Sequence, residues 1–166
     1  RPLVVMSPKS LLRHPRATSA VRELVDGAFQ PVLQDTSAVE KADRITRLIL
    51  CSGKVYFDVL SVLDSESLEH VAVARLEQLY PFPDEAVRDA VAAYPNLTEV
   101  VWTQEEPRNM GALSHIGPRL RAVVPRPISL KHSSRPERAS PAEGNPADHR
   151  REQDRLIREA LGLLED

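Results

Sequence analysis

Two adjacent carboxylates, Glu105 and Glu106, follow an apolar and β-branched run at residues 97–103. Buried parallel strands deliver polar groups in this way to the carboxyl edge of an α/β sheet. A carboxylate at that edge can transfer protons when burial raises its pKa. Neighbours in an extended segment point to opposite sides, however, so Glu105 and Glu106 cannot share one proton. We therefore favour a structural role, in which one of them caps a helix or pairs with an arginine at an interface.

The turn Ser52-Gly53-Lys54 is a second candidate for chemistry, because it follows an apolar run at residues 45–51. Backbone amides at the start of a helix can bind a phosphate, and a lysine there adds positive charge. The turn lacks the further glycines of a phosphate-binding loop, so a tight connection between a strand and a helix is the simpler interpretation. Both interpretations stay open.

The spacing of histidines and cysteines gives little reason to expect a metal site or a reactive thiol. The five histidines are dispersed, and no cysteine or histidine pair has the spacing of a zinc site. Cys51 is the single cysteine, which excludes an internal disulfide, and its apolar neighbours indicate packing in a strand rather than a reactive thiol. No nucleophile elbow, dinucleotide-binding fingerprint or kinase signature occurs. We assign no catalytic residue and no metal ligand to the chain.

Apolar runs alternate with helical patterns in the order that an α/β fold requires. Val55, Val59 and Val62 recur at helical spacing directly after one strand-like run and before the next. This alternation predicts a three-layer α/β domain, with a mostly parallel sheet and right-handed crossovers. The expected strands are residues 3–6, 45–51, 71–76, 97–103 and 128–131, and the expected helices are residues 55–63, 84–94 and 113–123.

The composition changes after residue 132. Residues 133–146 are poor in apolar side chains and rich in turn formers, so they are expected to run extended over the surface. A terminal helix follows, and its apolar stripe must dock on the rest of the protein. We therefore divide the chain into an α/β domain at residues 1–132 and, at residues 133–166, a tail and helix packed on the same domain. The stripe consists of Leu156, Ile157, Ala160, Leu161 and Leu164.

Composition excludes several classes of protein. The chain has 166 residues, 42% of them hydrophobic and 28% charged, which is ordinary for a soluble globular domain. A net charge of −2 gives no reason to expect nucleic acid or an anionic membrane as a partner. No apolar run approaches the roughly 20 residues of a membrane helix. The start at Arg1 rather than at methionine leads us to expect a piece of a longer protein.

Several stretches, in order along the chain, carry a family resemblance. Residues 2–15 read Pro-Leu-Val-Val-Met-Ser-Pro-Lys-Ser-Leu-Leu-Arg-His-Pro, and residues 104–112 read Gln-Glu-Glu-Pro-Arg-Asn-Met-Gly-Ala. Both are similar to segments in the C-terminal region of 2-oxoglutarate dehydrogenase, the thiamine diphosphate-dependent first component of its complex. Further similar stretches are residues 29–32 (Phe-Gln-Pro-Val), 50–58 (Leu-Cys-Ser-Gly-Lys-Val-Tyr-Phe-Asp), 75–83 (Arg-Leu-Glu-Gln-Leu-Tyr-Pro-Phe-Pro) and the tail at 135–142 (Arg-Pro-Glu-Arg-Ala-Ser-Pro-Ala).

The chain departs from the family pattern at two places. Met110 and Leu113 stand where the family usually has Gln and Trp, and Glu137 and Arg138 replace small residues in the tail. Arginine also greatly outnumbers lysine. These differences indicate a divergent branch of the family.

The resemblance implies a transketolase-like C-terminal domain of an enzyme that decarboxylates 2-oxoglutarate and passes the succinyl group to a lipoyl arm in the tricarboxylic acid cycle. Thiamine diphosphate and magnesium would be bound outside this chain, which on its own would lack the catalytic centre. The implied partners are a second copy in a homodimer and the lipoyl-bearing succinyltransferase component. The implied location is the cytoplasm of a bacterium or, in a eukaryote, the mitochondrial matrix.

The resemblance also implies roles for particular residues. The domain would support the homodimer and shape the active-site entrance, and we expect Gln104, Glu105, Glu106 and Asn109 at the subunit interface. The resemblance further implies that acetyl-coenzyme A or AMP could regulate the enzyme at this domain, as in some bacterial members of the family.

Thr46, Lys54 and Arg135 could surround such an anionic effector with a hydroxyl, an ammonium and a guanidinium. In the alternative, Lys54 is solvated and Arg135 pins the tail to the domain. A free-standing nucleotide-binding regulatory module and an independent enzyme built on the two glutamates are the rival functions.

Overall fold

A computed structural model describes residues 1–164 and divides the chain into two compact units, Arg1–Gln30 and Pro31–Asp166. The first unit holds only a 3₁₀ turn, η1 (Lys9–Leu11), and a five-residue helix, α1 (Val21–Val25). The expected buried strand at residues 3–6 is wrong, because these residues form no strand and their side chains are 69–91% exposed. A short apolar strand is stable only when a neighbouring strand supplies hydrogen bonds, and Arg1–Gln30 contains none.

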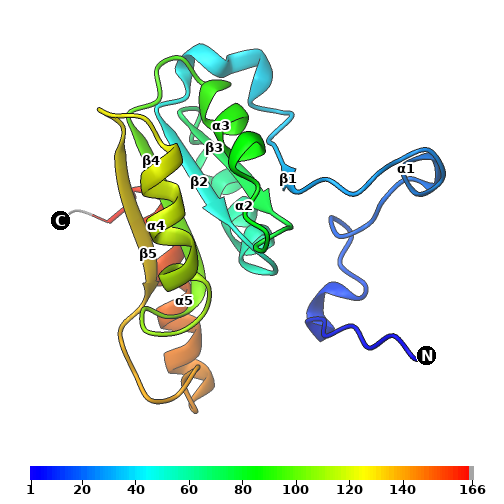
Figure 1. Ribbon diagram of the computed structural model, residues 1–166. Coiled ribbons are helices and arrows are strands. Elements are labelled where there is room, and N and C mark those ends of the chain that lie inside the picture. Colours follow the sequence, from blue (N-terminus) through cyan, green and yellow to red (C-terminus); the bar gives the residue numbers. More distant parts are fainter. Residues whose placement is uncertain (165–166) are drawn as a thin grey trace. The chain divides into compact units, whose positions relative to one another are not determined.

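The second unit is built on one five-stranded sheet with the order β1-β3-β2-β4-β5 (Figure 1). Strands β2, β3, β4 and β5 are parallel, and β1 pairs antiparallel with β3 at one edge. The prediction of a mostly parallel sheet is confirmed, although the two-residue strand β1 has no signal in the sequence. The strands are β1 (Val32–Leu33), β2 (Arg47–Cys51), β3 (Val71–Leu76), β4 (Glu99–Pro107) and β5 (Ser129–Arg135).

Helices cover both faces of this sheet, as a three-layer fold requires (Figure 1). Alternate residues of β2 point to opposite faces, so Leu48 and Leu50 join one core cluster while Ile49 and Cys51 join the other. The first cluster is completed by α3 (Asp84–Ala92) and α4 (Leu113–Val123), and the second by α2 (Val55–Glu66) and α5 (Pro146–Leu161). A short 3₁₀ segment, η2 (Val39–Arg44), precedes β2.

Both strands at the far edge of the sheet run further than their apolar residues indicate. β4 continues through Pro107, and β5 continues through Arg135. The expectation of a surface tail starting at residue 133 is therefore wrong for its first residues, because Ser133 is 1% and Arg135 is 3% exposed. The proposed boundary between the α/β domain and the tail falls inside β5, and the domain boundaries stay a proposal.

The terminal helix α5 begins and ends with strong local signals. Asn145 caps its start by accepting a hydrogen bond from the amide of Ala147 at 2.8 Å, and Pro146 occupies the first helical position. Gly162 ends it with a φ of 75°. A Cβ at Gly162 would lie 2.7 Å from the guanidinium carbon of Arg47, which is the far end of a flexible side chain, so the φ angle is what favours glycine here. The predicted stripe is buried except for Leu164, which lies beyond the helix and is 43% exposed.

Candidate functional site

The side chain of Gln104 organises the loop at the carboxyl end of β4. Its Nε2 donates to the carbonyl oxygens of Met110, Pro107 and Glu106 at 2.8, 3.1 and 3.3 Å. Its Oε1 accepts from the indole of Trp102 at 3.1 Å and from the backbone amide of Leu113 at 2.9 Å. Gln104 is 4% exposed. One buried amide thus ties the strand, the loop that follows it and the first residue of α4 together.

Gly111 makes this arrangement possible. Its φ is 66°, and a Cβ there would lie 3.0 Å from both the Gln104 amide nitrogen and the Cβ of Glu106. The loop therefore closes tightly over the Gln104 side chain. The two adjacent carboxylates lie on β4 just before this loop, where Glu105 is half-buried and Glu106 is exposed.

A polar network joins Glu105 to three other elements. The ammonium of Lys54 lies 3.1 Å from Glu105 and forms a short ion pair with Asp58. The amide of Gln153, on α5, donates to Asp58 at 3.0 Å and to Glu105 at 2.8 Å. Its oxygen accepts from Arg135 at 2.9 Å. Both polar atoms of the Gln153 side chain are therefore hydrogen-bonded at the carboxyl edge of the sheet.

Arg135 is the most buried cation of this network, at 3% exposure. Its guanidinium donates to Nδ1 of His149 at 3.2 Å, and its Nε lies 3.3 Å from Glu143. The Glu143 side chain is 5% exposed and also pairs with Arg138 at 2.9 Å. The Nε of Arg135 and Oε2 of Glu143 make no hydrogen bond of good geometry, so this pair is held by charge and burial. Arg135 thereby pins the tail to the domain, as the alternative interpretation expected. The other part of that interpretation, a solvated Lys54, is wrong, because Lys54 pairs with Asp58 and Glu105.

The tail is joined to the β4 loop by a reciprocal pair of hydrogen bonds. Asn109 donates to the carbonyl of Arg138 at 3.0 Å and accepts from its amide at 3.2 Å. The amide of Arg108 donates to the carbonyl of Arg135 at 2.9 Å. The loop and the tail therefore form one continuous surface at the end of β4 and β5.

The electrostatics of the network favour charge pairing over proton transfer. Burial lowers the pKa of Lys54, but the hydrogen bond that Lys54 donates to Asp58 and the charge of Glu105 outweigh burial and raise this pKa above its ordinary value. Lys54 is therefore charged at neutral pH and matched by carboxylates. This arrangement holds α2, β4 and α5 together through ion pairs and hydrogen bonds.

The three predicted effector contacts do not all lie together. Lys54 and Arg135 are linked through Gln153, whereas Thr46 precedes β2 at the opposite end of that strand. Five residues of strand separate the two ends by about 17 Å, so one phosphate group cannot touch all three side chains.

The predicted interface residues also differ in their surroundings. The side chain of Gln104 is used inside the domain, Glu105 pairs with Lys54, and Glu106 and Asn109 are exposed. Glu106 and Asn109 are thus the members of this set that a second subunit could reach. Their place at an interface stays a prediction.

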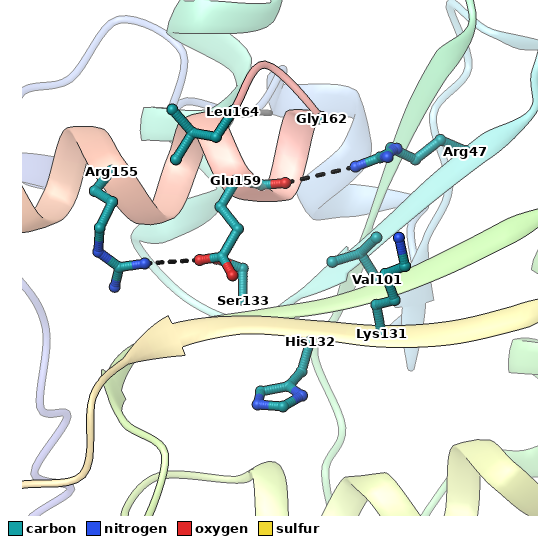
Figure 2. Close-up of a pocket in the computed structure, with 9 residues that line it drawn as sticks. All are labelled: Arg47, Val101, Lys131, His132, Ser133, Arg155, Glu159, Gly162 and Leu164. Atoms are coloured by element: carbon teal, nitrogen blue, oxygen red, sulfur yellow. Dashed lines mark hydrogen bonds and ion pairs between the residues drawn. The ribbon is translucent and has the colours of Figure 1, made fainter. Parts of the chain in front are cut away.

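A pocket of about 320 Å³ lies between the C-terminal end of α5 and strands β2, β4 and β5 (Figure 2). Arg47, Lys131 and Arg155 line it, and Figure 2 shows His132 on the other side of β5. Its cations are paired: Glu99 lies 2.6 Å from Arg47 and 2.7 Å from Lys131, and Arg155 lies 2.8 Å from Glu159. The sequence analysis missed this pocket, because its lining comes from separate elements with no motif in common.

Cys51 lies inside the second core cluster and is 0% exposed. Burial raises the pKa of its thiol to about 12, with the charge of Arg75 opposing this effect. The prediction of a packed rather than reactive cysteine is confirmed.

Residues 1–164 contain neither a cluster of metal-binding side chains nor a helix that could span a membrane. No group of three or more histidine, cysteine, aspartate or glutamate side chains gathers there as a metal site. None of the helices in that part of the chain has the length and apolar character needed to cross a bilayer.

The sheet order, the helices on both faces and the network at the carboxyl edge define a three-layer α/β domain with a structural polar edge. The profile of the family named 2-oxoglutarate dehydrogenase C-terminal matches residues 18–161. The chain belongs to this family.

Relatives with similar sequences are 2-oxoglutarate dehydrogenase E1 components. Identity is 49% over 162 residues with the Geobacillus kaustophilus protein, 45% over 163 residues with that of Bacillus subtilis, and 43% over 163 residues with that of Haemophilus influenzae. These matches cover 97%, 97% and 98% of this chain. The chain spans 17% of the length of each of these relatives.

Replacing Gln104 by leucine should destabilise the domain by about 3 kcal/mol. The indole N–H of Trp102 and the amide of Leu113 would both lose their acceptor, and a buried unsatisfied group costs about 1–3 kcal/mol. Urea unfolding followed by circular dichroism measures the change. Glu106→Gln, two residues away and exposed, is the control and should change the free energy of unfolding by less than about 0.5 kcal/mol. Equal effects of the two substitutions would contradict the role given to Gln104.

Alkaline pH should destabilise the domain through Cys51 and Tyr94. Burial raises both pKa values to about 12, from 9.0 for Cys51 and 10.0 for Tyr94, where the charge of Asp35 adds to the effect. Below pH 9 both groups are neutral in the folded and unfolded states, so they do not make the free energy of unfolding depend on pH. Above pH 9 the unfolded chain releases protons first, and each pH unit should remove about 1.4 kcal/mol through Cys51 until its folded pKa is reached.

Urea midpoints between pH 8 and pH 11 measure this loss. Cys51→Ala should be less stable at pH 8 because of the lost packing, but its stability should fall less steeply with pH. An unchanged slope in this variant would rule out the contribution of the thiol.

Proposed function

We propose that the chain is the C-terminal part of a protein that acts as the first component of a 2-oxoglutarate dehydrogenase complex. The observation that carries the proposal is the family match over residues 18–161, together with relatives that carry the E1 component name. The whole protein would decarboxylate 2-oxoglutarate and transfer the succinyl group to the lipoyl arm of a succinyltransferase partner, as a step of the tricarboxylic acid cycle. It would work in the bacterial cytoplasm or in the mitochondrial matrix.

The chemistry would take place outside this chain. Thiamine diphosphate supplies the carbanion chemistry in this proposal, and its diphosphate needs magnesium and free cationic or amide groups. The residues described here do not fit that group, because no metal-binding cluster gathers among residues 1–164 and the cations of the carboxyl edge already pair with carboxylates. The part of the longer protein that this chain does not cover would therefore hold the cofactor.

The domain would then support a homodimer and shape the entrance of the active site. The loop held by Gln104 favours this role, because a rigid loop at the carboxyl edge presents Glu106 and Asn109 outward in a fixed geometry. Its fixed backbone would also lower the entropic cost of association.

An anionic effector such as acetyl-coenzyme A or AMP would act at the Lys54–Arg135 network. Arg135 pairs with Glu143, so an incoming phosphate would have to replace this carboxylate and release the tail segment that carries it. Effector binding would thereby couple to the position of residues 136–145. Thr46 could take part only through a distant portion of a ligand as long as a coenzyme.

The rival function, a free-standing nucleotide-binding module at the turn Ser52-Gly53-Lys54, has no observation in its favour. Gly53 takes a φ of 72°, as a tight turn requires, but the ammonium of Lys54 is engaged by Asp58 and Glu105.

The natural protein that contains this chain should reduce ferricyanide with 2-oxoglutarate when thiamine diphosphate and magnesium are supplied. Purification from a host that lacks its own enzyme excludes a contaminating activity. The same preparation should behave as a dimer in sedimentation analysis. No turnover with 2-oxoglutarate, or turnover only with another 2-oxo acid, would overturn the proposed activity, and a monomeric active protein would overturn the dimer.

Calorimetry of acetyl-coenzyme A and AMP against that protein tests the effector site. Replacing Arg135 by alanine should weaken binding about tenfold or more, because a charge-assisted contact contributes about 1.5–3 kcal/mol. Arg44→Ala is the matched control, since Arg44 is an exposed arginine that pairs only at the surface with Glu69. The site would be refuted by the absence of heat with either ligand, or by the same affinity in both variants.

A further inference from the structure

Strand β5 leaves one side of its backbone without a partner strand. It is the last strand in the sheet order β1-β3-β2-β4-β5 and pairs with β4 alone, and no other strand of residues 1–164 lies beside it (Figure 1). The backbone of an edge strand offers a row of donors and acceptors to which another extended chain can add. The opposite edge offers less, because β1 has only two residues.

The hydrogen bonds to β4 show which residues of β5 face outward. The amide of Ser129 donates to the carbonyl of Thr98, just before β4, at 2.8 Å. Because a residue of a parallel strand directs its amide and its carbonyl to the same neighbour, the odd-numbered residues of β5 face β4. Leu130 and His132 therefore direct both backbone groups away from the sheet. Within residues 1–164 these outward groups have no hydrogen-bond partner.

The outward side of β5 is open over the first part of the strand. The side chains of Lys131 and His132 are exposed there. The open stretch ends at Ser134, whose carbonyl accepts from the guanidinium of Arg155 at 2.9 Å. Residues 129–133 are thus free to pair, and about five residues is the ordinary length of a strand.

The part of the chain that forms this edge is rich in cations. Residues 107–136, which run from the end of β4 through α4 and β5, contain no carboxylate. The chain as a whole has 24 carboxylates against 22 lysines and arginines, so positive charge is concentrated in this segment. Its lysines and arginines are Arg108, Arg119, Arg121, Arg126, Lys131 and Arg135.

Cationic side chains lie on both faces of the edge. Figure 2 shows Lys131 and His132 on opposite sides of β5. Arg121 is exposed in the last turn of α4, and Arg126 is exposed in the connection from α4 to β5. In the part of the chain that the structure describes, no carboxylate pairs with Arg121 or Arg126, whereas Lys131 meets Glu99 at 2.7 Å. The edge therefore carries positive charge that the domain does not neutralise.

These charges restrict what can add to the edge. Two copies of the chain joined through β5 by a twofold axis would bring Lys131 and His132 of one copy close to the same residues of the other. Like charges opposite each other in a sheet are destabilising, whereas opposite charges stabilise the pairing. The edge therefore disfavours a second copy and favours an extended segment rich in carboxylates.

We propose that β5 is a docking edge for an extended, acidic segment of another protein, which adds to the sheet as a sixth strand. The backbone of this segment bonds to the outward groups of Leu130 and His132, and its carboxylates lie near Arg121, Arg126 and Lys131. The backbone bonds supply affinity, and the cations select an acidic partner. This docking goes beyond the proposed function and does not depend on it.

Fluorescence anisotropy of a labelled peptide with the full-length natural protein tests the docking edge. The probe is the peptide Thr-Glu-Val-Glu-Thr-Glu-Val, in which glutamates alternate with β-branched residues. It should bind, and its affinity should fall at least about fivefold between low and high salt, because exposed charge pairs are screened. A copy with N-methylated glutamates should bind about tenfold more weakly, because it cannot donate backbone hydrogen bonds.

A peptide with lysine in place of each glutamate is the charge control and should not bind. Equal binding of the N-methylated peptide would overturn strand addition. Equal binding of the lysine peptide, or no binding of the acidic one, would overturn the proposal as a whole.

A matched pair of substitutions in the full-length protein places the peptide on the domain. Arg121→Glu should weaken binding of the acidic peptide about tenfold, because a like charge replaces an opposite one. Arg88→Glu is the control, since Arg88 is an exposed arginine on α3, outside the cationic segment, and its replacement should leave the affinity unchanged. Equal affinities of the two variants would reject β5 as the docking edge.

Hydrogen exchange on the full-length protein tests whether the edge is open. The amides of Leu130 and His132 should exchange rapidly in the protein alone and slowly once the acidic peptide is bound. Slow exchange in the protein alone would overturn the proposal, because another part of the polypeptide would then cover β5. Protection that appears only at high protein concentration would overturn it too, because the occupant would then be a second copy.

The outcomes separate the docking edge from the proposed function. An active enzyme that does not bind the acidic peptide would overturn the docking edge alone. A protein that binds the peptide at β5 but does not turn over 2-oxoglutarate would leave docking in place and overturn the activity.

Discussion

The buried guanidinium of Arg135 is the constraint on which the carboxyl edge of the domain depends. An unpaired charge at 3% exposure would cost several kcal/mol, so the chain must bring partners to it. Glu143 supplies the countercharge, while Gln153 and His149 supply acceptors. To deliver these partners, the chain after β5 has to turn back, and α5 has to lie on the sheet with Gln153 facing its edge. One buried cation thus fixes both the path of the tail and the register of the last helix.

The same network explains why a polar edge in an α/β fold need not be catalytic. Sites in such folds gather at the carboxyl ends of strands because polar groups converge there. Here the converging groups neutralise each other: Lys54 meets Asp58 and Glu105, and Arg135 meets Glu143. Side chains that are engaged with one another in this way are not available to contact a substrate. Fold position therefore indicates where chemistry could occur, and the pairing of charges decides whether it does.

Apolar periodicity was sufficient to predict β2, β3, β4, α4 and the two helical layers, because positions buried on one or both faces require apolar residues at the spacing of the element. It failed where burial depends on a partner distant in sequence. Ser133 and Arg135 are polar yet buried, since the Ser133 hydroxyl donates to the carbonyl of Leu156 at 2.7 Å and Arg135 meets the tail. The prediction for residues 3–6 failed in the opposite way, because these apolar residues were expected to be buried and are exposed. An apolar run predicts burial but does not identify the surface that covers it. Thr46 was grouped with Lys54 and Arg135 because its hydroxyl suits an anionic effector, and residue type carries no information on which end of a strand a residue occupies.

Contacts at the middle and at the C-terminal end of α5 determine which parts of this domain can respond to a ligand. At the amino end of the sheet, Arg47 donates to the carbonyl of Ala160 at 3.0 Å and packs against the space that Gly162 leaves open. At the carboxyl end, Gln153 bridges Asp58, Glu105 and Arg135. A helix held at two points over a close-packed sheet cannot shift without breaking hydrogen bonds at one of them. The tail at residues 136–145 carries Glu143, so a ligand that releases it must itself supply the negative charge that the buried Arg135 would then lack. A regulatory signal at this edge would therefore pass through the tail to the loop that carries Glu106 and Asn109, and the sheet would serve as its rigid support.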